Sequence, residues 1–384
     1  MGNPQLALES PFAMATDEPL HQLEELARAA EAHARLEHGV MLDAGALDGI
    51  LGAEAAKGDS RRRETLAASY GAWLGELVRK RWGAQWVGLS EPAAPRLRVG
   101  GLLVSPIDAV RRRLQDPAAP ALQALLDRLE KWIQEQKAGP PSSDAWDRLS
   151  EDPRFVGGDD LPRDTAAARE ALDEWIRKEG IQGKTLLCLG AGGGRHGPLH
   201  ALAGADVTVV DFSEKQLDRD RTVAAARGLK LQTVRASMDD LRILKDASFD
   251  LVLQPVSSCY VADVRRVYAE VARVLRRGGL YVAQHKQPAS LQGTSEPSAG
   301  GYVLVRPSVD GSRLPPLPGS VVREAGTAEF VHSLDALLGG LCRAGFVIED
   351  VVEPPRADAW APAGSAGHRA WFLPPYLKIK ARRA

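Results

Sequence analysis

Hydrophobic and polar positions in the first 140 residues alternate with the periods of helices and short strands. Between residues 20 and 38, Leu23, Leu26 and Ala30 recur every three or four positions, which places them on one helical face. The same criteria predict further helices at 60–81, 107–114 and 121–136 and short strands at 85–87 and 97–99. Residues 1–140 are therefore predicted to form a small α+β domain, and we find no catalytic constellation in it.

The composition changes between residues 137 and 164. Residues 137–144 (KAGPPSSD) are rich in Gly, Pro and Ser, and residues 151–162 are also typical of a loop. We therefore expect a linker at 141–164, whose second half lies over the pocket of the domain that follows. From about residue 165 onward, helix-like and strand-like segments alternate, which predicts an α/β domain at 165–384.

A run of glycines follows the first strand of this second domain. Residues 185–189 (TLLCL) are apolar, as in a strand that is buried on both faces. Gly190, Gly192 and Gly194 come next, and a helix is predicted directly after them. The order strand, glycine turn, helix lets a ligand approach bare backbone amides at a helix N-terminus.

The next predicted strand, 207–210, is followed by Asp211. A carboxylate at this position can accept hydrogen bonds from ribose hydroxyls, and its separation from Gly190, 211 − 190 = 21 residues, suits a β-α-β unit. A dinucleotide-binding GxGxxG turn would need glycine at the position of Arg195. The glycines match GxGxG instead, which disfavours NAD as the ligand.

Three more strands are predicted at 232–236, 248–254 and 280–284, with a helix at 264–275 before the last of them. We expect this helix to end at Arg276 and Arg277, followed by Gly278, because basic residues and a glycine are typical of a helix C-terminus.

In these segments the chain resembles the class I S-adenosylmethionine-dependent methyltransferases. The segments that carry the resemblance are LCLGAGGG, VTVVD, ASMDDL, SFDLVLQ and VARVLRRGGLYV. The resemblance covers about residues 165–380 and implies a Rossmann-like, seven-stranded sheet with an antiparallel final strand. Residues 345–352 and 376–380 resemble the closing hairpin of that family, and an insert is expected at about 286–331.

The resemblance also implies S-adenosylmethionine as the cofactor. The glycine turn would contact its methionine end, Asp211 its ribose, and Phe212 and residues 237–239 its adenine, with the Met238 amide as a donor. The predicted cofactor-binding residues are Gly190, Ala191, Gly192, Gly194, Asp211, Phe212, Ser237, Met238, Asp239 and Gln254.

Two positions depart from the family pattern. Cys188 stands where the family usually has an acid, and Ser237 stands where aspartate is frequent. A buried thiol behaves as a small hydrophobe, so Cys188 is expected to pack in its strand. Because of these departures, a second interpretation stays open, in which the protein binds S-adenosylmethionine without catalysing methyl transfer.

The acceptor is expected above the carboxyl ends of the strands. His285, after the fifth strand, is the predicted base or substrate-orienting residue, and a hydrogen bond to a neighbouring loop is the alternative. Tyr260, after the fourth strand, is predicted to line the substrate, with ordinary packing as the alternative. The stretch 292–320, rich in Gly, Pro and Ser, is hypothesised to be a substrate lid.

Charge and composition limit the partners. Lys and Arg number 49 against 50 Asp and Glu, a net charge of −1, which disfavours nucleic acid as a partner. No apolar run approaches the ~20 residues that cross a bilayer, so no membrane partner is expected. The three cysteines are far apart and no spacing suits a metal ion, so no metal site is expected either.

These observations predict a cytoplasmic enzyme that transfers a methyl group from S-adenosylmethionine to a small molecule by in-line displacement. Two other interpretations stay open. One is methylation of a protein or RNA, with residues 1–140 as the recognition domain, and the other is cofactor binding without catalysis.

Overall fold

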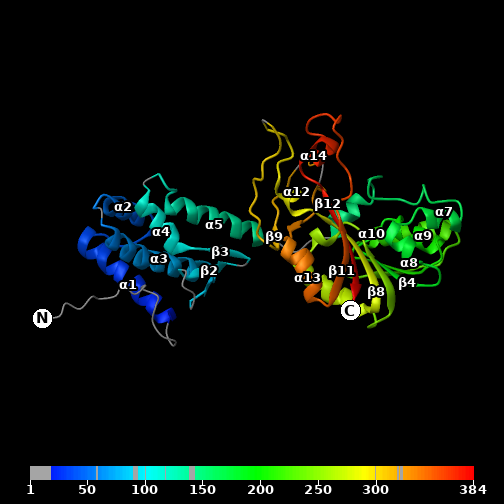
Figure 1. Cartoon of the computed structure of the whole chain (residues 1–384), viewed down its shortest axis with the longest axis horizontal. Helices are drawn as coiled ribbons and strands as arrows, with labels where there is room; N and C mark the ends of the chain where they lie inside the picture. Colours follow the sequence, from blue (N-terminus) through cyan, green and yellow to red (C-terminus); the bar gives the residue numbers. More distant parts are fainter. Residues whose placement is uncertain are drawn as a thin grey trace. The chain divides into compact units, whose positions relative to one another are not determined.

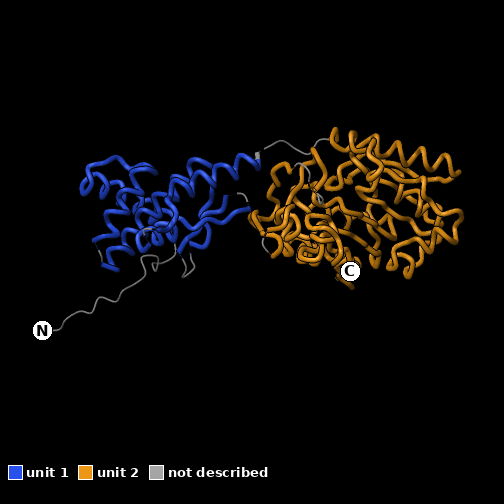
Figure 2. The backbone as a smooth tube through the Cα atoms, turned by 90° about the horizontal axis from the view of Figure 1, so that it is seen from above, with its two compact units in different colours: residues 1–137 blue, residues 138–384 orange. Residues whose placement is uncertain are grey.

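The structure is a computed structural model that describes residues 19–57, 59–89, 94–99, 101–116, 118–137, 143–298, 300–317, 320 and 323–384. The chain forms two compact units, Met1–Lys137 and Ala138–Ala384, coloured separately in Figure 2. Among the described residues, no helix has the length and apolar character that a membrane span requires.

Unit 1 combines helices with a small antiparallel sheet (Figure 1). Its elements are α1 (Pro19–His38), α2 (Ala44–Ala55), α3 (Ser60–Trp82), β1 (Gln85–Val87), β2 (Arg96–Val99), β3 (Leu102–Val104), α4 (Pro106–Gln115) and α5 (Leu122–Lys137). Every helix and strand predicted for this region is present. The sequence analysis missed β3 and α2, the latter capped by Asp43, whose Oδ1 accepts a hydrogen bond from Ala46 N at 2.7 Å.

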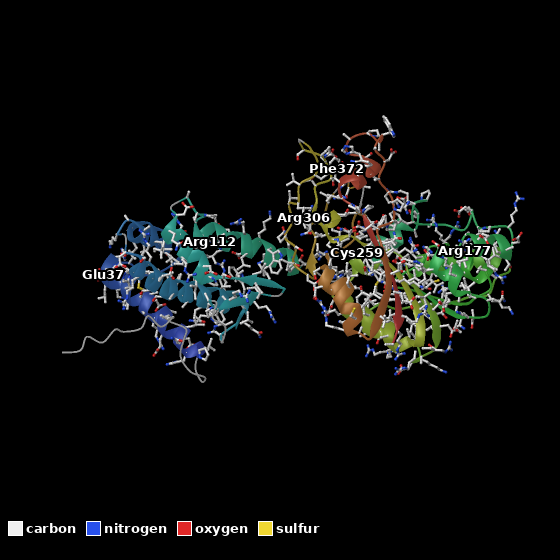
Figure 3. The ribbon with its side chains drawn as sticks, viewed as in Figure 1. Glu37, Arg112, Arg177, Cys259, Arg306 and Phe372 are labelled. Atoms are coloured by element: carbon white, nitrogen blue, oxygen red, sulfur yellow. The ribbon has the colours of Figure 1, made fainter. Side chains whose placement is uncertain are left out.

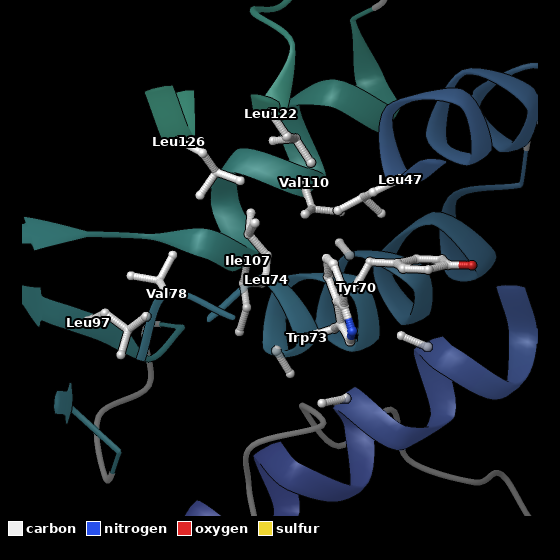
Figure 4. Packing of buried hydrophobic residues seen from close by; sticks show 14 of the residues in the cluster. Leu47, Tyr70, Trp73, Leu74, Val78, Leu97, Ile107, Val110, Leu122 and Leu126 are labelled. Carbon is white, nitrogen blue, oxygen red and sulfur yellow. The ribbon is translucent and has the colours of Figure 1, made fainter. Parts of the chain in front are cut away.

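Helix α3 forms the centre of unit 1, and most of its residues from 66 to 78 are buried. Two glycines allow neighbouring elements to approach it closely. A Cβ at Gly71 would lie 2.4 Å from Ile107 Cα, and one at Gly75 would lie 2.2 Å from the Trp86 ring. Figure 4 shows the surrounding apolar side chains, which pack into one core between α1, α3 and α4.

Unit 2 contains a mixed sheet and helices. Its elements are α6 (Ser143–Leu149), α7 (Thr165–Glu170), α8 (Glu174–Glu179), β4 (Thr185–Leu189), α9 (His196–Leu202), β5 (Asp206–Asp211), α10 (Glu214–Ala226), β6 (Gln232–Arg235), β7 (Phe249–Gln254), a 3₁₀ turn (Ser258–Tyr260), α11 (Val264–Val274), β8 (Leu275–Lys286), α12 (Pro288–Gln292), β9 (Ser312–Arg313), β10 (Phe330–Val331), a π-helical turn (Asp335–Gly339), α13 (Gly340–Arg343), β11 (Phe346–Val352), α14 (Ala366–Phe372) and β12 (Tyr376–Arg383).

The main sheet has seven strands in the order β11-β12-β8-β7-β4-β5-β6. Strands β4 to β8 pair in parallel, whereas β12 is antiparallel to both β8 and β11. This arrangement confirms the predicted Rossmann-like fold with its antiparallel final strand. Because β4 lies between β5 and β7, the chain reverses direction across the sheet there, and such a switch point opens a crevice for ligands at the strand ends.

Successive residues of β4 pack on opposite faces of the sheet. Leu186 and Cys188 belong to a core with residues of α7, α8 and α10, whereas Leu187 and Leu189 belong to a core with α11 and α13. The strand is apolar throughout because both of its faces are covered by helices.

Helix α11 and strand β8 correct one prediction. The helix ends at Val274, and Leu275 already has the extended conformation with which β8 begins. Residues 276–279 are therefore part of a twelve-residue strand and not a helix cap, with a register shift between β7 and β8 at Phe249 and Leu251. The strand also extends to Lys286, beyond its predicted end at residue 284, so His285 lies within β8 and not after it.

The segment expected as a linker also differs from the prediction. Residues 143–164 belong to unit 2, and α6 lies against α10. Ser213 Oγ donates a hydrogen bond to Asp147 Oδ1 at 2.6 Å, and Gly157 N donates one to Gly193 O at 2.7 Å. The second half of the segment therefore contacts the glycine turn.

Candidate functional site

The glycine turn connects β4 to α9 at the carboxyl edge of the sheet (Figure 1). Gly190, Gly193 and Gly194 have φ angles of 56°, 106° and 78°, which lie in the left-handed region that favours glycine. A Cβ at Gly192 would lie only 3.1 Å from Asp211 Oδ2. Glycine is therefore needed both for the backbone conformation of the turn and for its close approach to β5.

Asp211 ends β5 and faces this turn. Its Oδ2 accepts a hydrogen bond from Gly192 N at 3.0 Å, and its Oδ1 accepts one from Ser213 N at 3.0 Å. Burial raises the pKa of Asp211 above its ordinary value, against the effect of these backbone donors. Each carboxylate oxygen keeps a second lone pair, so Asp211 can accept further hydrogen bonds from the hydroxyls of a ligand.

A second carboxyl group, Asp220 of α10, contacts the same turn and was not predicted. Its Oδ2 accepts a hydrogen bond from Gly193 N at 2.9 Å, and its side chain is fully buried. Burial raises the pKa of Asp220 to about 7. The sequence held one indication of this role, because Asp220 is an acid on the apolar helical face formed by Leu217 and Val223.

Cys188 occupies the strand position where the family resemblance implies an acid. It is fully buried, and burial and the nearby Asp220 both raise the pKa of its thiol. The thiol is therefore a packing group, as expected. The carboxyl group beneath the glycine turn comes from α10 instead of from β4.

Met238 and Gln254 lie beside the first glycine. Gln254 is fully buried and donates from Nε2 to Ser257 Oγ at 3.1 Å and to Met238 Sδ at 3.3 Å, while its Oε1 accepts a hydrogen bond from Tyr281. A Cβ at Gly190 would lie 2.8 Å from Ser257 Oγ and 3.0 Å from Met238 Cε. The structure therefore brings Gln254 of β7 together with residues of the segments that follow β6 and β7 at the glycine turn.

The other predicted cofactor residues border the same edge. Ala191 is buried, Phe212 is half-buried, and Ser237 is exposed, with Oγ donating to Asp239 Oδ1 at 2.5 Å. Helix α6 and the residues after it complete this edge with aromatic side chains that were not predicted. Trp146 contacts Phe155 and Tyr260 edge-to-face, at ring-centroid distances of 5.8 Å and 4.9 Å.

His285 is buried inside unit 2. Its Nδ1 lies 2.6 Å from Ser258 Oγ, and its ring contacts Tyr268 of α11 edge-to-face at 6.2 Å. Burial, followed by the neighbouring His332, lowers the pKa of His285 to about 3, so its imidazole is neutral at pH 7. The hydrogen bond to Ser258 corresponds to the alternative in which this histidine bonds a neighbouring loop.

Tyr260 lies near Lys286, the residue after His285. The Tyr260 hydroxyl donates a hydrogen bond to Glu324 Oε2 at 2.7 Å, and Lys286 Nζ lies 5.6 Å from the Tyr260 ring centre. Burial raises the pKa of Tyr260 well above its ordinary value. Figure 3 labels Cys259, the buried neighbour of Tyr260 in the 3₁₀ turn.

Lys286 anchors a buried ionic cluster that joins β8 to the insert. Its Nζ binds Glu324 and lies 2.6 Å from Glu329 Oε1, while Arg323 pairs with the other oxygen of Glu329. Burial disfavours the charged ammonium, yet the two carboxylates raise the pKa of Lys286 above its ordinary value. The cluster thus contains two cationic and two carboxylate side chains. Sequence analysis missed this cluster because three of its members come from the insert.

Known proteins are similar to this chain over part of its length. A methyltransferase domain family matches residues 187–283. The chain is 39% identical over 177 residues to the uncharacterized methyltransferase YbaJ of Bacillus subtilis, a match that covers 45% of this chain and 69% of that protein. It is 35% identical over 107 residues to a ubiquinone biosynthesis O-methyltransferase of Aromatoleum aromaticum, covering 28% of this chain and 46% of the relative.

Among solved structures, an S-adenosylmethionine-dependent methyltransferase of Mesorhizobium loti is 28% identical to this chain, with a TM-score of 0.44. That match covers 57% of this chain and 96% of the other.

Proposed function

This chain belongs to the S-adenosylmethionine-dependent methyltransferases, and from that premise we propose that it methylates a small molecule by in-line displacement. The observation that carries the proposal is the glycine turn with Asp211 hydrogen-bonded to Gly192 N. When bound, S-adenosylmethionine supplies a methyl group that is bonded to a sulfonium sulfur. The sulfur centre is the leaving group and needs no further activation. The chain then has to hold the two reactants in line, which alone can supply ~7–11 kcal/mol.

The cofactor residues are those predicted from the sequence, and their contacts support that role. The free lone pairs of Asp211 accept hydrogen bonds from the ribose hydroxyls, and the partly exposed Gly190 and Gly192 of the glycine turn face the methionine end. Phe212, Met238 and Asp239 border the adenine. Gln254 has an indirect role: its hydrogen bonds to Ser257 and Met238 hold in place the two side chains that lie beside Gly190.

The acceptor binds beside Tyr260, at the carboxyl ends of β7 and β8. Tyr260 contributes a ring face held by Glu324, Lys286 and Trp146. His285 acts through Ser258 as a positioning residue, since its neutral imidazole fixes the hydroxyl of that residue.

The role of His285 has its own test. Replacement of His285 by alanine should lower kcat at least about tenfold while leaving the KM for S-adenosylmethionine unchanged, because it loosens the acceptor side alone. Because the pKa of His285 is about 3, this residue should cause no inflection near pH 6.5 in the pH profile of the wild-type rate. The profile of the variant should therefore have the same shape in that range.

A small-molecule acceptor is supported by the net charge of −1 and by the matched relative named for ubiquinone biosynthesis. Incubation of the purified chain with tritiated S-adenosylmethionine and fractionated extract tests this choice. Label in a low-molecular-mass fraction is expected. Label in protein or RNA would support recognition by residues 1–140, and no label above a heat-treated control would support binding without catalysis.

The cytoplasmic location stays a prediction, which fractionation of the source cells would test.

A further inference from the structure

Unit 1 contains a cluster of three metal-ligand side chains that the methyl-transfer site does not use. His33 and His38 lie in α1 and Glu54 lies near the end of α2, and one donor atom from each lies within 4.8 Å of the other two. The Glu54 side chain is fully buried, and the His38 side chain is 14% exposed. The sequence analysis expected no metal site, because these residues follow no familiar ligand spacing and meet only when α1 and α2 pack.

The two imidazoles are arranged as metal ligands. His33 Nδ1 lies 2.7 Å from the hydroxyl of Tyr70, which leaves His33 Nε2 directed elsewhere. That Nε2 is buried and has no hydrogen-bond partner among the described residues, whereas the equally buried His38 Nε2 pairs with a carboxylate oxygen of Glu54. A hydrogen bond to the second nitrogen is the usual way in which a protein orients a metal-binding histidine. His38 Nε2 lies 3.2 Å from Glu54 Oε1, a separation that two ligands of one ion can adopt.

Both carboxylate oxygens of Glu54 are paired with cations, one of which is about half exposed. Arg62 Nε holds Glu54 Oε2 at 2.8 Å, whereas Oε1 is paired with Lys57 Nζ at 2.7 Å. The Lys57 side chain is 49% exposed, so it can move into solvent and release Oε1 to an ion. Arg62 would then remain as the partner that orients the carboxylate.

We propose that His33, His38 and Glu54 bind a divalent zinc ion through two imidazole nitrogens and one carboxylate oxygen, with water as a fourth ligand. Nitrogen-rich donor sets of this kind suit Zn²⁺, whereas Ca²⁺ and Mg²⁺ prefer oxygen ligands throughout. The ion would connect α1 to α2, and Tyr70 of α3 would support it through His33. Its effect would therefore be on the stability of unit 1.

The test uses the full, untagged chain after removal of metals with a chelator. Zinc titration against a chromophoric competitor should show one tight equivalent, and the loaded protein should have a higher Tm. The double variant His33→Gln/His38→Gln should bind zinc more than about 100-fold more weakly, because outer partners of a zinc ligand alone contribute about 10- to 100-fold. The variant His21→Gln is the matched control, since His21 is an exposed histidine of the same helix.

A wild-type chain that binds no tight equivalent would overturn the proposal, as would a double variant that binds zinc as the wild type does. If the double variant fails to fold, the proposal is tested instead with the wild type loaded with Co²⁺. The visible absorption of tetrahedral cobalt, abolished by added zinc, supports the site, and its absence refutes it.

Discussion

A buried carboxyl group beneath a ligand-binding turn is costly when ionised, and Asp220 is such a group. It lies under the glycine turn with Gly193 N as a donor, while its Oδ1 has no partner among the described residues. Burial raises its pKa from 3.8 to about 7. In the folded chain the neutral acid therefore persists over a pH range in which the unfolded chain is already ionised.

This shift predicts a pH-dependent stability. Between about pH 4 and pH 7 the folded state holds a proton that the unfolded state has lost, so the Asp220 contribution to stability falls as pH rises. Asp220→Asn keeps an oxygen acceptor for Gly193 N and removes the titration. Urea unfolding across this range should show the variant gaining stability relative to wild type as pH increases. Parallel curves for the two proteins would contradict the assignment.

At the scale of elements, the ionic cluster fixes the insert to β8. Lys286 faces Glu324 and Glu329 in a buried setting, and Arg323 supplies the second cation. Replacing one member of such a cluster leaves a charge that neither water nor a partner compensates. The insert should therefore depend on Lys286 for its attachment.

Lys286→Met should destabilise unit 2 by about 3–5 kcal/mol in urea unfolding, because it leaves the carboxylates with a single cation. Lys215→Met is the matched control, since Lys215 pairs with Glu151 at 3.6 Å and both side chains are more than half exposed. Its effect should stay within about 0.5 kcal/mol. Equal effects of the two substitutions would show that the cluster does not anchor the insert.

The same elements show how far the sequence predicts the structure. The strands around the glycine turn could be predicted because apolar runs and turn residues are local features of the chain. Residues 276–279 misled the prediction, since basic residues and glycines suit a helix end as well as an irregular strand start. The partners of Lys286, Glu324 and Glu329, lie 38 and 43 residues further on, and no local pattern pairs them.

For the whole molecule, each unit has its own hydrophobic core. All predicted cofactor residues belong to the second unit, 138–384. A fragment of these residues should therefore fold alone and bind S-adenosylmethionine within about twofold of the full chain in calorimetry. A fragment that folds but binds more than about tenfold more weakly would show that unit 1 contributes to the cofactor site.

The most direct test is calorimetry of S-adenosylmethionine binding to the wild type, to Asp211→Ala and to Asp218→Ala, an exposed acid of α10. The wild type and Asp218→Ala should bind one equivalent with equal affinity. Asp211→Ala should bind at least about tenfold more weakly, because a hydrogen bond to a charged group contributes about 1.5–3 kcal/mol. Unchanged affinity in Asp211→Ala, or a wild type that binds a nicotinamide dinucleotide in preference to S-adenosylmethionine, would contradict the assigned site.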